Sequence, residues 1–114
     1  MSELDDLFAP CAPQVRATYD AIMTAARGFG EVRADPKKTS VHLVAGTGFA
    51  GAHPRKTALL LNIRTGAPID SPRIRKVERV SANRFHNEML LGQPSEVDEE
   101  VIGWLKAAFS LGRR

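Results

Sequence analysis

The sequence contains a single cysteine, Cys11, and this scarcity excludes a disulfide within the chain. A lone thiol is typical of proteins from reducing compartments. The sequence also lacks any apolar run of about 20 residues, the length that a helix needs to cross a bilayer. Its N-terminal stretch is acidic and has no apolar centre, so it does not fit a secretory signal. We therefore expect a cytoplasmic protein that has no membrane contact.

Residues with catalytic or metal-binding chemistry are also few. The three histidines, His42, His53 and His86, do not show the spacing of a zinc motif. None of the serines lies in a G-x-S-x-G sequence, and Cys11 has no histidine nearby. We predict no catalytic residue, no metal and no cofactor.

Apolar residues, in contrast, are plentiful enough to build one core. Hydrophobic residues make up 43% and charged residues 25% of the 114 residues, which are ordinary values for a globular protein. A chain of this length folds as one domain without the help of a disulfide or a metal. We expect a flexible or docking tail over residues 1–12 and a single domain over residues 13–114.

Two segments have the apolar spacing of amphipathic helices. Over residues 13–28, apolar side chains recur along one face, and Pro13 suits the first helical position. A second helix is predicted over residues 95–110, because Ser95 and Asp98 have the spacing of a capping box. Each helix has a single apolar stripe, so each needs a sheet face to cover.

The segment between the helices is rich in β-branched and apolar residues separated by short turns. We predict strands over residues 39–45, 48–54, 57–64 and 85–91, with a shorter candidate at 31–34. Residues 72–80 fit a short helix or a strand. Short turns favour an antiparallel meander. The predicted fold is therefore α+β, with an N-terminal helix, a meander of four to five strands and a C-terminal helix, and with the helices on one sheet face.

A glycine-rich segment at residues 46–51 matches the letters of the dinucleotide motif G-x-G-x-x-G. That motif needs a helix after its last glycine, so that the helix N-terminus meets the pyrophosphate. Pro54 follows too closely for such a helix. We predict a tight hairpin with positive φ at Gly46 or Gly48, and no bound nucleotide.

Basic side chains concentrate in the middle of the chain. Residues 31–91 hold eleven Lys or Arg against five Asp or Glu, whereas the whole chain has a net charge of +3. Most of them fall in or beside predicted turns, and alternate turns of a meander lie at the same end of the sheet. Such a surface suits an anion. The predicted ligand-binding residues are Lys37, Lys38, His53, Arg55, Lys56, Arg73, Arg84 and His86.

A set of short motifs runs along residues 13–110. They are Lys37-Lys38-Thr39-Ser40, Phe49-Ala50, Pro54-Arg55-Lys56, Leu59-Leu60-Leu61-Asn62-Ile63-Arg64, Ser71-Pro72-Arg73, His86, and Val97-Asp98-Glu99-Glu100-Val101 with Trp104-Leu105 and Ala108. Together they resemble a bacterial family of small domains of unknown function, which are sometimes fused behind other domains, including nuclease-like ones. The resemblance implies an α-β-meander-α domain, and it implies no activity, cofactor or catalytic residue.

Three functions remain open at this point. The first is a non-enzymatic binding module that recognises an anionic ligand, nucleic acid or an acidic partner through its basic strand–turn surface. The second is a small enzyme that acts on a phosphorylated substrate with His53 or His86 as acid or base. The third is a self-associating accessory domain that forms a homodimer through its tail, where Leu4, Leu7 and Phe8 have helical spacing. A histidine and a carboxylate within hydrogen-bond reach would favour the enzyme.

Overall fold

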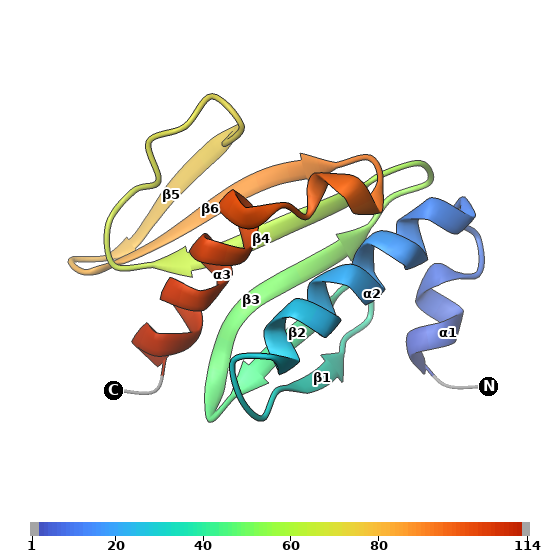
Figure 1. The fold of residues 1–114 in the computed structure, drawn as a ribbon, viewed down its shortest axis with the longest axis horizontal. Coiled ribbons are helices and arrows are strands. Elements are labelled where there is room, and N and C mark those ends of the chain that lie inside the picture. The colour runs from blue at the N-terminus through green and yellow to red at the C-terminus, as the bar shows by residue number, and fades with distance from the viewer. Residues whose placement is uncertain (1–2, 113–114) are drawn as a thin grey trace.

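In the computed structural model, which describes residues 3–112, six antiparallel strands form one sheet and two long helices lie across one of its faces (Figure 1). The helices are α1 (Glu3–Phe8), α2 (Pro13–Arg27) and α3 (Glu99–Gly112), and η1 (Pro94–Glu96) is a 3-10 turn. The strands are β1 (Arg33–Pro36), β2 (Val41–Ala45), β3 (Thr47–Pro54), β4 (Leu59–Thr65), β5 (Lys76–Ser81) and β6 (Arg84–Leu91). Within the described part of the chain, no helix is both long and apolar enough to cross a membrane.

The strand order in the sheet is β1-β2-β3-β4-β6-β5. The first four strands follow one another as a meander. The loop of residues 66–75 then carries the chain to the sheet edge, where β5 begins and returns through a tight turn into β6. The α+β class and the placement of both helices on one face are confirmed, but the sheet has six strands instead of the predicted four to five.

The two outer strands, β1 and β5, have the weakest strand pattern in the sequence. β1 has only four residues and ends at Pro36, which cannot donate to a strand ladder. All six residues of β5 are exposed, so apolar alternation does not identify them. The helix-or-strand alternative at residues 72–80 is resolved as a strand from Lys76 onward.

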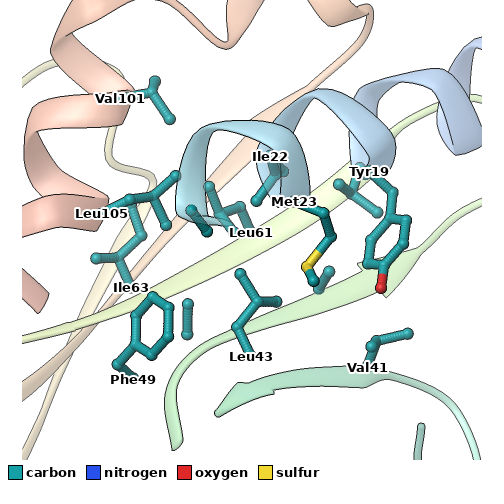
Figure 2. Close-up of a cluster of buried hydrophobic side chains, with 14 of the residues drawn as sticks. Tyr19, Ile22, Met23, Val41, Leu43, Phe49, Leu61, Ile63, Val101 and Leu105 are labelled. Atoms are coloured by element: carbon teal, nitrogen blue, oxygen red, sulfur yellow. The ribbon is translucent and has the colours of Figure 1, made fainter. Parts of the chain in front are cut away.

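The core lies between the sheet and the two long helices (Figure 2). Leu61 and Ile63 of the central strand β4 are fully buried beneath Ile22 and Met23 of α2 and Leu105 of α3. Burying side chains of this size contributes about 1.5–3 kcal/mol each to folding. The predicted first helix is confirmed, because α2 begins at Pro13 and buries its apolar stripe.

The C-terminal helix begins later than predicted. Residues 94–96 form η1, and α3 starts at Glu99. Oδ1 of Asp98 accepts a hydrogen bond from the backbone N–H of Val101 at 3.2 Å, so Asp98 and not Ser95 caps the helix. The prediction of a capping box that starts at Ser95 is therefore wrong, since this serine lies inside a separate 3-10 turn that begins at Pro94.

The described part of the predicted tail, residues 3–12, contains α1, which packs on α2, whereas residues 1 and 2 lie outside the described residues (Figure 1). The ring of Phe8 lies 5.0 Å from that of Tyr19, centroid to centroid. Nη1 of Arg16 lies 3.1 Å from Oδ1 of Asp5. The apolar side chains of α1 thus pack on the domain's own core, and a homodimer through the tail stays a prediction.

Candidate functional site

The sheet face opposite α2 and α3 carries polar side chains in two rows across three strands. Residues directly opposite each other in an antiparallel sheet point to the same side, with Cβ atoms about 4.5–5.5 Å apart. One row consists of Arg64, His86 and Glu78, and the next consists of Asn62, Glu88 and Lys76, in each case from β4, β6 and β5 in that order.

Arg64 is held by a backbone hydrogen bond to a neighbouring strand. Its Nη1 donates to the carbonyl oxygen of Gly48 in β3 at 2.8 Å. A Cβ added at Gly48 would lie only 3.0 Å from the same nitrogen. The missing side chain at Gly48 therefore leaves the space in which the guanidinium lies, and this bond uses one of the five N–H donors of that group.

A hollow of about 330 Å³ opens beside Arg64, where β3 and β6 approach the C-terminal part of α3. Its cationic lining comes from Arg64 and Arg84, His86 lines it as well, and none of the described residues that line it is acidic. Nη1 of Arg84 donates to the carbonyl oxygen of Asn83 at 3.1 Å. Within residues 3–112, neither arginine takes part in an ion pair. Two guanidinium groups thus face one hollow without a protein counter-charge.

Two histidines of this face, His86 and His42, have pKa values below the ordinary value of a histidine. Burial lowers the pKa of His86 below its ordinary value of 6.5, and the charge of Arg64 lowers it further, against the opposing effect of Glu78. The pKa of His42 is also lowered, first by burial and then by Arg64 and Lys37. Each imidazole therefore offers one N–H donor and one acceptor nitrogen at neutral pH.

A second, smaller hollow of about 40 Å³ adjoins the first and shares His86 with it. Its described lining residues are Asn62, Lys76, Glu78, His86 and Glu88. Oδ1 of Asn62 is buried and has no hydrogen-bond partner among the described residues. An unpaired buried carbonyl oxygen costs about 1–3 kcal/mol, so a donor from a ligand would stabilise this place.

Five of the predicted ligand-binding residues lie toward the other end of the sheet. Lys37 and Lys38 follow β1, whereas Arg55 and Lys56 lie between β3 and β4. These two turns are at the same end of the sheet, as predicted, because the first four strands form a meander. His53 lies one residue before the end of β3 and is partly buried.

The charges at that end are partly compensated by carboxylates. Nζ of Lys37 lies 2.9 Å from Oδ2 of Asp35. A hollow of about 410 Å³ beside Lys37 and Lys38 is also lined by Glu3 and Asp6 of α1. This end of the sheet therefore offers an anion less net positive charge than the hollow beside Arg64.

Arg84 lies at the other end of the sheet from these two turns, and the charge of Arg73 is compensated, so the expectation of one basic surface is corrected. Nη1 of Arg73 donates to carboxylate oxygens of Asp98 and Glu100, each at 3.0 Å, so its charge is neutralised. Arg84 starts β6, where it lies beside His86 in the hollow of Arg64. The sequence therefore grouped Arg84 and His86 with the wrong neighbours, because the path of the loop at residues 66–75 decides which strands meet.

The glycine-rich segment at residues 46–51 forms a hairpin, as predicted. Gly46, with a φ of 78°, makes the tight turn from β2 to β3, and residues 47–51 form the first part of β3. No helix follows it before β4, so the segment does not have the strand–helix context of a dinucleotide site.

Sequence reasoning missed Arg64 and Asn62 as site residues. Both lie in β4, where they alternate with the buried Leu61 and Ile63. Polar side chains at alternate positions of a central strand mark a sheet face that is not packed on a core. That alternation is the available signal, but their partners on β6 depend on the pairing of two strands that are not consecutive in the sequence.

Within residues 3–112, no group of three or more His, Cys, Asp and Glu side chains is arranged so that it could hold a metal ion.

A family model described as a domain of unknown function (DUF5655) matches residues 4–112. No curated protein and no solved structure matches the chain.

Proposed function

The chain belongs to the DUF5655 family of domains of unknown function, and we propose that it is a binding module for a small phosphate-bearing ligand. The phosphate group lies between Arg64 and Arg84, and His86 supplies a neutral donor. The observation that carries the proposal is the hollow of about 330 Å³, in which two arginines have no carboxylate among the described lining residues.

The charge of the hollow favours phosphate over carboxylate. A phosphate monoester carries close to two negative charges at neutral pH, and two guanidinium groups balance them. Arg64 and Arg84 are each anchored through Nη1 to a backbone carbonyl oxygen, so less side-chain freedom is lost when an anion binds. Guanidinium forks also match the geometry of phosphate oxygens.

Nucleic acid is a weaker interpretation of the same charges. Non-specific binding of single strands uses exposed aromatic rings on which bases stack. The only aromatic side chain among the described lining residues, other than the imidazole of His86, is Phe49, which is 1% exposed. The basic turns at the other end of the sheet are partly compensated by Asp35, Glu3 and Asp6. A small ligand therefore fits the site better than a strand of bases.

An acid–base enzyme is also less well supported. Such a site needs a histidine oriented by a partner within hydrogen-bond reach. Glu78 lies opposite His86 in the sheet, but no hydrogen bond joins His86 to a carboxylate within the described residues. The arrangement supports binding without supplying the oriented pair that catalysis requires.

The test is a titration of the ¹⁵N-labelled protein with inorganic phosphate at low salt. Saturable shifts are expected at Gly48, Arg64, Arg84 and His86. Arg84→Gln should weaken binding by about tenfold or more, because a hydrogen-bonded charge is lost. Arg55→Gln, at the other end of the sheet, is the matched control and should bind as the unchanged protein does. Unmoved signals at these residues, or an equal effect of both variants, would overturn the proposal.

A further inference from the structure

The two hollows lie on either side of one shared lining residue, His86. The larger one contains Arg64 and Arg84, and the smaller one contains Asn62 and Glu88. His86 and Glu88 are two residues apart in β6, which corresponds to about 6.8 Å along a strand. A ligand whose phosphate lies beside Arg64 therefore reaches the smaller hollow with a group a few bonds away.

The smaller hollow presents several hydrogen-bond acceptors. The buried Oδ1 of Asn62 has no partner among the described residues, and the carboxylates of Glu78 and Glu88 add further acceptors. Lys76 and His86 also line the hollow and can donate, so a hydroxyl, which donates to Oδ1 of Asn62 and accepts from a neighbour, suits it best.

The local charges favour a neutral donor over an ammonium group. Glu88 lies 3.8 Å from the guanidinium of Arg75, measured from Oε1 to Nε. Lys76 lines the same hollow and opposes the charge of Glu78. With two acidic and two basic groups around it, the hollow offers no net negative charge to attract a cation. Its volume of about 40 Å³ suits a group of the size of a hydroxyl or hydroxymethyl.

We infer that the ligand is a phosphate monoester of a small polyol, of the sugar-phosphate class. The phosphate lies between Arg64 and Arg84, and a hydroxyl of the polyol donates to Oδ1 of Asn62. The absence of an exposed aromatic side chain among the described lining residues disfavours a nucleobase. This inference rests on the proposed function, since it places the phosphate in the same hollow.

Three probes test the polyol inference separately from the proposed phosphate site. They are inorganic phosphate, methyl phosphate and ribose 5-phosphate. All three should shift the signals of Arg64 and Arg84. Ribose 5-phosphate should bind about tenfold more tightly than methyl phosphate, because only the sugar offers hydroxyl donors. If none of the three binds, the proposed function itself fails. If methyl phosphate and ribose 5-phosphate bind equally well, the phosphate site stands and the inference of a polyol is overturned.

Two variants test which residues cause the preference for ribose 5-phosphate over methyl phosphate. Asn62→Leu keeps the approximate size of the side chain and removes the acceptor, so it should abolish the preference for ribose 5-phosphate without changing the affinity for methyl phosphate. Glu88→Gln, which changes only the charge of a partly buried side chain, should reduce the same preference, and it provides the test if Asn62→Leu does not fold. A preference that survives both substitutions would contradict the assignment.

Discussion

Nη1 of Arg73 lies 3.0 Å from Oδ1 of Asp98, and this contact joins the loop before β5 to the start of α3. The same nitrogen donates to Oε1 of Glu100 at 3.0 Å, while Nη2 donates to the carbonyl oxygen of Glu96 at 2.9 Å. Asp98 also caps α3 through the N–H of Val101. Arg73 therefore links two parts of the fold, namely the loop at residues 66–75 that precedes β5 and the helix α3 that covers the sheet.

Arg73→Gln should lower the melting temperature by several degrees, because it removes a charge that three carbonyl and carboxylate groups share. Arg79→Gln in β5 is the control, since the only hydrogen bond described for Arg79 runs from Nε to the nearby carbonyl oxygen of Ser81. Thermal unfolding followed by circular dichroism measures both. Equal melting temperatures for the two variants would show that the contacts of Arg73 contribute no more than an ordinary surface arginine.

The same cluster predicts an acid dependence. The hydrogen bond from Arg73 lowers the pKa of Asp98 below its ordinary value of 3.8. The unfolded chain therefore takes up a proton more readily than the folded one, and the contribution of Asp98 is full above that ordinary value and is lost as pH falls through the lowered pKa. The difference in melting temperature between the unchanged protein and Arg73→Gln should be largest near neutral pH and shrink below about pH 4. A difference that stays constant across the range would exclude this ion pair as its source.

The strong signals of the sequence predicted the centre of the fold well. Apolar periodicity is clear wherever a helix or strand packs one side on the core, as in α2 and β4. β5 carries no such signal, because its six residues are exposed and only its pairing with β6 holds it in place. The start of α3 was misplaced since Ser95 and Asp98 are both good capping residues, and only Asp98 also has a partner in Arg73.

The site could be predicted only in part, for a related reason. Arg84 and His86 were named as site residues, and they do lie in one hollow. Their neighbour Arg64 comes from β4. This strand pairs directly with β6, although β5 lies between the two in the sequence. Local spacing carries no information on that long-range pairing, so the sequence could not show which basic residues meet.

The hairpin at Gly46 gives a prediction about backbone conformation alone. An added Cβ at Gly46 would meet no atom within 4 Å, but its φ of 78° is unfavourable for any residue with a side chain. Gly46→Ala should therefore destabilise the protein by about 1–2 kcal/mol. Gly103 in α3 also has open space around an added Cβ, and Gly103→Ala should stabilise by about 0.5–1 kcal/mol because alanine favours a helix. Urea unfolding measures both changes, and a destabilising Gly103→Ala or a neutral Gly46→Ala would contradict this account.

Gly48→Ala should separate binding from folding, because the added Cβ would meet only the far end of a flexible side chain. That atom would lie 3.0 Å from Nη1 of Arg64. Among the described residues positive φ is found only at Gly46, so the backbone at Gly48 accepts alanine. The guanidinium should shift away from the carbonyl oxygen of Gly48, and stability should change by less than about 0.5 kcal/mol, as it does for most surface substitutions.

Phosphate affinity should nevertheless fall in Gly48→Ala, since Arg64 loses the hydrogen bond that fixes its guanidinium beside the hollow. Gly51→Ala is the matched control in the same strand, because its Cβ would lie at an ordinary distance of 3.8 Å from Cδ2 of His42 and would not meet Arg64. Urea unfolding and phosphate titration of both variants give the two readouts. If Gly48→Ala binds phosphate as tightly as Gly51→Ala while Arg64→Gln does not bind, then Arg64 acts by its charge alone and the hydrogen bond to Gly48 does not position it.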